Sequence, residues 1–252
     1  MDTIRTELLK QWGISPGVDE NLLVPHIAAE RGDLNLFKEA LKVGLDPNQK
    51  DGERGTLPLH WAVQKLSFEV AEYILKEKIN DPNCRNFEGN TPLHYATVKG
   101  SKRMSQLLVE HGAEVNAVND SRQIPVFGAV FERYDHVIEY LASLSDPKCH
   151  ACKKKRCAIH RADLDFTDED GNTALHLAGV HHWGNGTYNL LVQLGADETI
   201  KNKEGKYPVP PMKIVHKTVR EVLFGLVSVL VIILAIWWGV NKPAEKDTGI
   251  YH

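Results

Sequence analysis

Short apolar stretches return along most of the chain at a nearly constant spacing. The stretches LPLHWA (57–62), TPLHYA (91–96) and TALHLA (173–178) share one frame, and VPHIAA (24–29) and IPVFGA (124–129) fit it with looser lettering. Their register positions are His26, His60, His94, Phe127 and His176, at separations of 34, 34, 33 and 49 residues. A fixed period in this range indicates a stack of repeated supersecondary units rather than a single globular core.

Each unit reads as two short helices. An alanine stands two positions after every register residue, at Ala28, Ala62, Ala96, Ala129 and Ala178, where a small side chain lets neighbouring helices approach closely. Thr91-Pro92 has the composition of a helix start, and the glycine of LLVEHGA, Gly112, that of a helix end. One pair of helices cannot bury its apolar face alone, so the units must stack.

The segment GNTPLHYATVKG, followed by LLVEHGAEVNA, is similar to a whole unit of the ankyrin repeat family, and the resemblance covers about residues 20–207. It implies an all-α solenoid of about five repeats plus a truncated sixth, with a hairpin loop before each helix pair. Residues 1–19 are expected to cap the first unit. The sixth unit opens as KEGKYPVPP, and its prolines prevent a normal first helix.

An uncharged segment follows the repeats. Residues 222–240, VLFGLVSVLVIILAIWWGV, would span roughly 28 Å as a helix, close to the ~30 Å hydrocarbon core of a bilayer. We expect a single transmembrane helix, reached through a juxtamembrane linker at 208–221 and followed by a short tail at 241–252; a buried core helix is the alternative. Six basic residues lie in 201–221 and two in the tail, which places the N-terminal domain in the cytosol. The membrane would be that of the endoplasmic reticulum or the mitochondrial outer membrane, or alternatively an organellar inner or thylakoid membrane.

The small residues of this segment fall on one side of the expected helix. They are Gly225, Ser228, Ala235 and Gly239, within a sector of about 80°. Small residues on one face allow a second transmembrane helix to pack closely, although chance could place them so.

The long gap between the fourth and fifth units contains an insertion at about 146–164, with three of the four cysteines of the chain. Cys149, Cys152, Cys157 and His160 have thiol and imidazole groups in numbers that could hold zinc tetrahedrally. A free basic loop, a disulfide, and S-acylation or redox sensing remain open as alternatives.

Composition and motifs argue against catalysis and nucleic-acid binding. The net charge is −3, and no G-x-S-x-G, Walker or H-E-x-x-H pattern occurs. In the family that the chain resembles, the register histidine hydrogen-bonds the backbone of adjacent loops, so His60, His94 and His176 are interpreted as structural.

The resemblance implies binding of a protein partner on the concave surface, through hairpin tips and residues after the first-helix alanine. Carried over by position, the candidates are Glu53, Arg54, Gln64 and Lys65; Glu88, Asn90, Val98 and Lys99; Ser121, Gln123, Phe131 and Glu132; and Glu169, Asn172, Val180 and His181. The sequence therefore predicts a membrane-anchored interaction scaffold or adaptor without catalytic activity. The alternative is an accessory subunit of a larger membrane complex, such as an organellar respiratory or photosynthetic assembly, whose transmembrane helix packs against other subunits.

Overall fold

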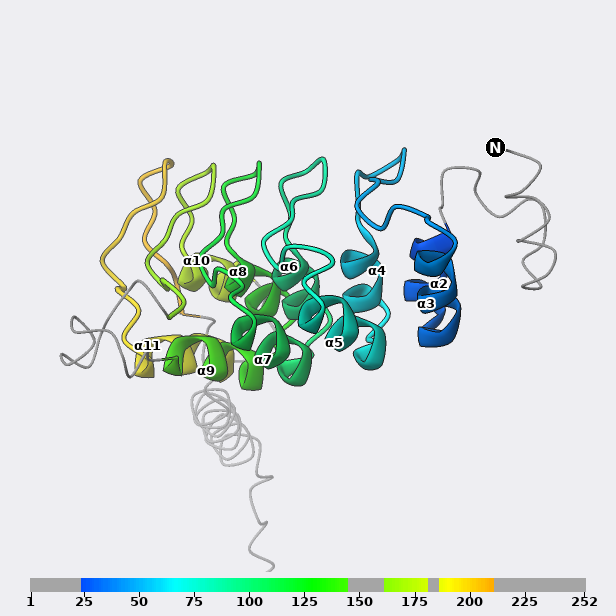
Figure 1. Ribbon diagram of the computed structural model, residues 1–252. Coiled ribbons are helices and arrows are strands. Elements are labelled where there is room, and N and C mark those ends of the chain that lie inside the picture. Colours follow the sequence, from blue (N-terminus) through cyan, green and yellow to red (C-terminus); the bar gives the residue numbers. More distant parts are fainter. Residues whose placement is uncertain (1–23, 145–160, 181–185, 211–252) are drawn as a thin grey trace, which may run out of the picture. The chain divides into compact units, whose positions relative to one another are not determined.

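The computed structural model describes residues 24–144, 161–180 and 186–210, and every regular element in these ranges is a helix (Figure 1). The helices form five consecutive pairs. They are α2 (Val24–Arg31) with α3 (Leu34–Lys42), α4 (Pro58–Gln64) with α5 (Phe68–Lys76), α6 (Pro92–Val98) with α7 (Lys102–Glu110), α8 (Pro125–Phe131) with α9 (Asp135–Ser143), and α10 (Ala174–Val180) with α11 (Gly186–Gln193). The expected all-α array of helix pairs is confirmed for this part of the chain.

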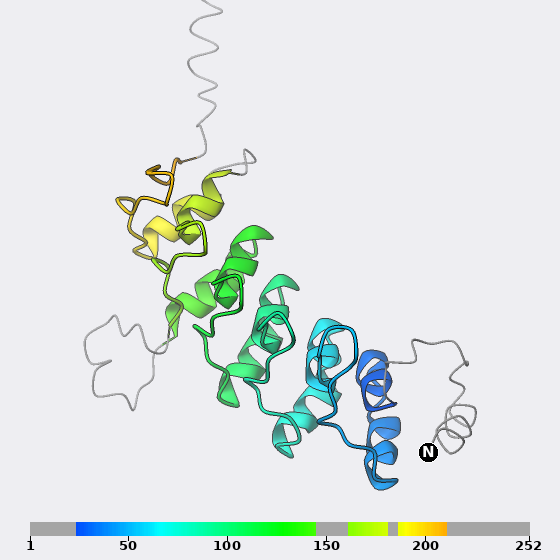
Figure 2. The same cartoon turned by 90° about the horizontal axis from the view of Figure 1, so that it is seen from above.

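Successive pairs stack side by side in two rows. The first helices contact one another in the order α2, α4, α6, α8 and α10, and the second helices in the order α3, α5, α7 and α9. A long loop precedes α4, α6, α8 and α10 and extends past the end of the first-helix row (Figures 1 and 2). We call the surface made by these hairpin loops and the exposed side of the first helices the first-helix face.

Local sequence fixes where these helices begin and end. Proline is the first residue of α4, α6 and α8, where its missing N–H group costs no hydrogen bond. The Asp33 and Ser101 side chains cap α3 and α7 by accepting hydrogen bonds from the backbone N–H groups of Leu36 and Met104. Gly112 ends its unit with a φ of 93°, a left-handed conformation that favours glycine.

The core follows the repeat pattern. Ala28, Ala62, Ala96 and Ala129 are each 0% exposed, which confirms their predicted place between neighbouring helices. The buried apolar residues form two clusters, one running from Val24 to Ala113 and the other from Val115 to Ala196. Each cluster draws on several units, so no unit has a core of its own.

The array resumes after the expected insertion at Arg161. The Asn116 side chain donates to the Arg161 carbonyl at 2.8 Å and accepts from the Asp163 N–H at 2.9 Å. One unit earlier, the Asn83 side chain likewise donates to the Gly112 carbonyl at 3.0 Å and accepts from the Glu114 N–H at 2.7 Å. Arg161 therefore occupies the place that Gly112 has in a regular unit, and Ala162 and Leu164, at the end of the range expected for the insertion, are buried in the second cluster.

The start of the sixth unit forms a hairpin without a following helix in the described residues. The Asn202 N–H donates to the Lys206 carbonyl at 3.0 Å, and residues 206–210 are not helical. The chain then lies against α10, where a Cβ on Gly179 would come within 2.3 Å of the Val209 carbonyl oxygen. This close approach requires glycine at position 179.

Several predicted features lie outside the described residues: the N-terminal cap, His181, the metal-ligand candidates Cys149, Cys152, Cys157 and His160, and the segment 222–240 with its small residues. Among the helices of residues 24–144, 161–180 and 186–210, none is long and apolar enough to cross a bilayer.

Candidate binding site on the first-helix face

Asparagine and aspartate side chains stabilise the hairpin loops by accepting hydrogen bonds from backbone N–H groups. Asn86 accepts hydrogen bonds from the N–H groups of Glu88 and Asn90 at 3.0 and 2.8 Å, and Asp168 does the same for Asp170 and Asn172 at 3.0 and 2.8 Å. Asparagine and aspartate favour such turns because their side chains mimic a backbone acceptor. The tips of these loops are thereby held in a defined conformation.

Neighbouring hairpins are joined to one another. The Phe87 N–H donates to the Arg54 carbonyl at 2.8 Å, and the Asp120 N–H donates to the Glu88 carbonyl at 3.0 Å. The amide of Asn119 donates to the side-chain oxygen of Asn90 at 2.9 Å, and Asn90 in turn donates to the Glu88 carboxylate at 2.9 Å. Side chains on successive loops are thus positioned relative to each other.

The register histidines hold the first helices to the next loop. Nε2 of His60 lies 3.2 Å from the Asn90 carbonyl, and Nε2 of His176 lies 3.0 Å from the Lys206 carbonyl. Nδ1 of each ring accepts a backbone N–H bond at 3.1 Å, from Leu57 and Thr173. Both contacts require the neutral ring with its proton on Nε2. The structural interpretation of these histidines is confirmed.

Burial favours the neutral form of two register histidines, His60 and His94. Desolvation, partly opposed by the backbone hydrogen bonds to Asn90 and Gln123, lowers the pKa of His60 and of His94 to about 4. Neither ring faces a nucleophilic side chain poised for attack: the Cys84 thiol lies 3.8 Å from Nδ1 of His60, and its burial raises its own pKa to about 12. His60, His94 and His176 therefore serve to join neighbouring units.

The candidate partner-binding residues in the described part of the chain occupy the first-helix face. Seven charged candidates are exposed: Glu53, Arg54, Lys65, Glu88, Lys99, Glu132 and Glu169. Lys65 forms an ion pair with Glu30 at 2.9 Å, so that candidate is already engaged within the stack. Asn90 and Gln123 are partly buried, and His181 lies outside the described residues.

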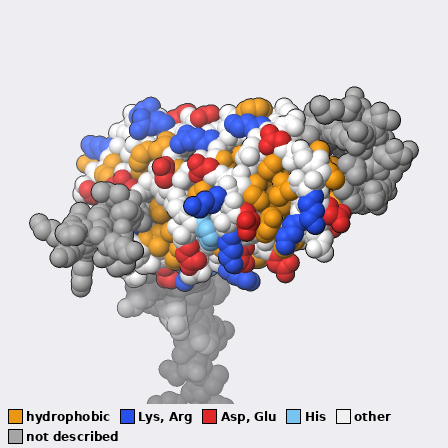
Figure 3. All heavy atoms as spheres, in the orientation of Figure 1, with side chains coloured by type: hydrophobic (Ala, Val, Ile, Leu, Met, Phe, Trp, Pro, Cys, Tyr) orange, Lys and Arg blue, Asp and Glu red, His pale blue; other side chains and the backbone are white. Residues whose placement is uncertain are grey.

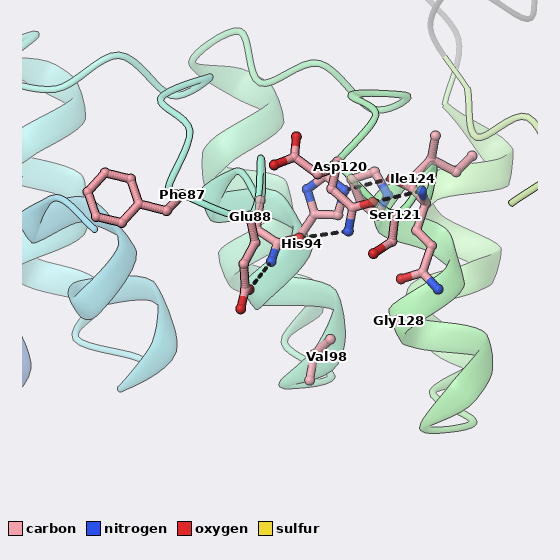
Figure 4. Close-up of a pocket in the computed structure, with 12 residues that line it drawn as sticks. Phe87, Glu88, His94, Val98, Asp120, Ser121, Ile124 and Gly128 are labelled. Atoms are coloured by element: carbon pink, nitrogen blue, oxygen red, sulfur yellow. Dashed lines mark hydrogen bonds between the residues drawn. The ribbon is translucent and has the colours of Figure 1, made fainter. Parts of the chain in front are cut away.

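The structure brings five of the predicted candidates together around a pocket: Glu88, Asn90, Val98, Ser121 and Gln123. Glu88, Asn90 and Gln123 lie between the third and fourth hairpins, and together with α6 and α8 they enclose a cavity of about 600 Å³ (Figure 4). The other candidates are spread along the face.

Sequence reasoning did not propose the other lining residues as binding residues, and two of these, Asp120 and Gly128, shape the pocket. Asp120 sits at the tip of the fourth hairpin, and Gly128 lies on α8 at the position after the register residue. The corresponding positions in the two preceding units are Trp61 and Tyr95. Aligning the repeats by column would have revealed the glycine, because it stands where the two preceding units have aromatic rings and the fifth unit has Leu177.

Exposed apolar side chains lie beside the pocket. Val98 at the end of α6 is 45% exposed, and Phe131 at the same position of α8 is 56% exposed. A second face, drawn in Figure 3, shows basic and acidic side chains interspersed without a continuous field of one sign. Mixed charge of this kind is unlike the basic stripe of a nucleic-acid binder.

Within the described residues, no group of three or more histidine, cysteine or acidic side chains is placed to hold a metal ion. The arrangement on the first-helix face consists of fixed loop tips, an open pocket and exposed apolar groups. Such a surface can bind another molecule by shape, hydrogen bonds and apolar contact.

Comparison with known proteins agrees with the geometry. Residues 25–119 match the family model described as "Ankyrin repeats (3 copies)". The chain is 29% identical over 161 residues to the E3 ubiquitin-protein ligase KEG of Arabidopsis thaliana, covering 60% of this chain and 10% of that protein. It is 31% identical over 98 residues to the NF-kappa-B inhibitor cactus of Drosophila melanogaster, covering 38% of this chain and 19% of that protein.

A longer match is to Ankyrin repeat and SOCS box protein 16 of Homo sapiens, which is 25% identical over 224 residues, or 79% of this chain and 48% of that protein. The chain thus spans less than half the length of each of these relatives. The matched family model, the paired helices and the hairpin loops agree, and residues 25–119 consist of ankyrin repeats.

Proposed function

We propose that this chain is a membrane-anchored interaction scaffold or adaptor without catalytic activity, and that its ankyrin repeats bind a protein partner on the first-helix face. The observation that carries the proposal is the pairing of Val98 and Phe131, two large apolar side chains exposed at equivalent positions of adjacent first helices beside an open pocket. Apolar side chains exposed together beside fixed polar groups are typical of a protein interface.

The relatives support an interaction role by their diversity. A ubiquitin ligase, an inhibitor of NF-kappa-B and a cation channel of Homo sapiens, the transient receptor potential channel subfamily A member 1, all carry a stretch similar to this chain. Proteins with such different activities share the repeat, so the repeat itself supplies recognition rather than a reaction.

The experiment that tests this role places a photo-reactive residue on the face. The full chain carries p-benzoylphenylalanine at position 131 in one variant and at position 43 in the control, because Val43 is 54% exposed at the end of α3, in the other row of helices. We expect a discrete cross-linked partner from position 131 and none from position 43. Equal labelling from both positions, or none from either, contradicts the proposal.

Anchoring is a separate part of the proposal and is supported by the uncharged segment 222–240. The full chain should remain with membranes after extraction at alkaline pH, whereas a chain ending at residue 211 should be released. Release of both would contradict an anchor. We further propose that Cys149, Cys152, Cys157 and His160 hold zinc, which would order a polar insertion that has no apolar core.

The second candidate function is an accessory subunit of a larger membrane complex, favoured by the small residues on one side of the segment 222–240. Replacing Gly225 and Gly239 by leucine should then release the complex in a detergent pulldown and shift the native-gel band to the monomer. Unchanged migration counts against this second function and leaves the scaffold proposal in place.

A further inference from the structure

Gly128, on the α8 side of the pocket between the third and fourth hairpins, stands where the second and third units have an aromatic residue. In the second unit, Trp61 fills the corresponding space and its Nε1 donates to Asp51 at 3.3 Å. In the third unit, Tyr95 does so, and its hydroxyl accepts from Asn86 at 3.0 Å. In the fourth unit Gly128 has no side chain, and Val98 and Thr97 of α6 approach its backbone closely instead.

The floor of the pocket is closely packed around Gly128. A Cβ built there would come within 2.7 Å of Cγ2 of Val98 and 3.1 Å of Oγ1 of Thr97. Even a methyl group would press on Val98, so the glycine sets the depth of the pocket. Figure 4 shows Glu88 and Val98 on the α6 side, and Ser121, Ile124 and Gly128 on the α8 side.

The polar rim of the pocket accepts hydrogen bonds. Among its described lining residues, Glu88 and Asp120 are acidic and exposed, and none is a lysine or an arginine. The Asn90 amide donates to the Glu88 carboxylate at 2.9 Å and so uses its own donor to orient that acid. The side-chain oxygens of Ser121 and Gln123 lie on the same rim. A ligand that matches this rim must carry positive charge and several donors.

The walls below the rim are apolar. The apolar surface that a ligand can reach there is that of Val98, which is half exposed, whereas Ile124 and Pro125 are buried beneath the loop. A long side chain with methylene groups and a charged head fits a pocket with apolar walls and an acidic mouth, because the stem is buried while the head keeps its hydrogen bonds.

We propose that this pocket takes an arginine side chain from a partner polypeptide, with the guanidinium group at Glu88 and Asp120 and the methylenes against Val98. Arginine fits better than lysine because its planar group presents five donors to carboxylate and amide oxygens spread around the rim. The inference rests on the proposed function, since it names the chemistry of the partner on the first-helix face.

The probe that tests this proposal is a library of random 12-residue peptides, selected on the immobilised full chain. The best peptide is then synthesised with its arginine and, as a matched peptide, with citrulline, which has the same shape without the charge. We expect every enriched peptide to contain arginine, and citrulline to weaken binding at least tenfold.

Two variants of the chain locate the contact. The double variant Glu88→Gln, Asp120→Asn removes both charges at nearly constant shape. It should weaken binding of the arginine peptide at least tenfold and leave binding of the citrulline peptide unchanged. Gly128→Tyr restores the aromatic residue of the column and should abolish binding of both peptides. Glu139→Gln, an exposed acid on α9 in the other row of helices, is the control and should have no effect. Circular dichroism checks that each variant is folded.

Enrichment of peptides without arginine, no enrichment at all, or equal binding of the arginine and citrulline peptides overturns the proposal. The proposal is also overturned if the double variant still binds the peptide in an arginine-dependent way, because the arginine would then contact other residues. The cross-linking experiment from position 131 does not depend on this pocket. If position 131 cross-links a discrete partner but the peptide test fails, the arginine proposal is rejected and the scaffold proposal stands.

Discussion

His94 joins its own helix to the next hairpin through Gln123: Nε2 of the ring lies 3.1 Å from the Gln123 carbonyl oxygen, while Nδ1 accepts the Thr91 N–H at 3.1 Å. The same two residues line the pocket between the third and fourth hairpins. The contact that holds the array together thus also fixes one wall of the candidate site. A weaker joint at this point would change both the stability of the stack and the shape of the pocket.

Replacing His94 by alanine should lower the free energy of unfolding by about 1–3 kcal/mol, because two buried backbone groups lose their partner. Urea denaturation followed by circular dichroism measures the change. His136→Ala is the matched control, since this exposed ring also contacts a backbone carbonyl, that of Gly100 at 2.8 Å. We expect its effect to be less than about 0.5 kcal/mol. An equal loss of unfolding free energy in both variants would show that burial of the His94 hydrogen bonds is unimportant.

The buried histidines should make the stack sensitive to acid. The pKa of His60 and of His94 is about 4 in the folded chain, against 6.5 as the ordinary value. Between these values the unfolded chain binds protons that the folded chain does not, so stability falls as the pH falls through this window. At pH 4.5 the loss relative to pH 7 should be roughly 2 kcal/mol for each histidine.

The double variant His60→Gln, His94→Gln tests the origin of this acid sensitivity. Glutamine does not titrate, so the variant should be less stable than the natural chain at pH 7 but should lose less on acidification. Unfolding in urea at pH 7, 5.5 and 4.5 gives the comparison. The same acid-induced loss in both proteins would assign the effect to other groups.

The exposed pair beside the pocket should matter for binding and not for folding. Replacing Val98 and Phe131 by serine should abolish the partner cross-link, read from a photo-reactive residue at position 132 next to the pair. The free energy of unfolding should change by less than about 0.5 kcal/mol, because both side chains already contact solvent. The control Val43→Ser removes an equally exposed side chain from the end of α3. Loss of the cross-link in the control would mean that the effect is not specific to the face.

Zinc bound by the insertion should be measurable in the purified full chain as about one equivalent of metal. Four such ligands complete a tetrahedral structural site. The variant Cys152→Ser, Cys157→Ser should lose the metal, whereas Cys84→Ser should keep it because Cys84 lies within the first core cluster. A zinc content below half an equivalent in the natural chain would reject the site and favour a free loop or a disulfide.

The sequence alone predicted the paired helices, the alanine column and the role of the register histidines, because each depends on local composition and a fixed period. It also placed Glu88, Asn90 and Gln123 on a common face. The pocket itself was not predicted. It lies beside Gly128, which lacks a side chain that Trp61 and Tyr95 supply elsewhere, and a missing group is visible only when the columns of the repeat are compared.

The two hydrogen bonds by which Asn116 holds the start of the fifth unit were also not predicted, for a different reason. Asn116 joins Arg161 and Asp163 across 45 and 47 positions, whereas its counterpart Asn83 joins Gly112 and Glu114 across 29 and 31. The repeat period identifies the asparagine, but it does not indicate where the array resumes after an insertion. Short side chains that contact a distant loop depend on the stacked geometry. Their partners can therefore be assigned only once the helices are in place.

Phe127 occupies the register position of the fourth unit, where a phenyl ring can neither donate nor accept the hydrogen bond that histidine makes in its neighbours. The joint to the fifth unit therefore depends on apolar packing and on the Asn116 contacts, neither of which titrates. In acid, the first three joints loosen while this one keeps its strength, so the array should come apart from its N-terminal side. Under mechanical tension at neutral pH we expect the joint at Phe127 to separate first, because apolar surfaces slide past each other more readily than hydrogen bonds break.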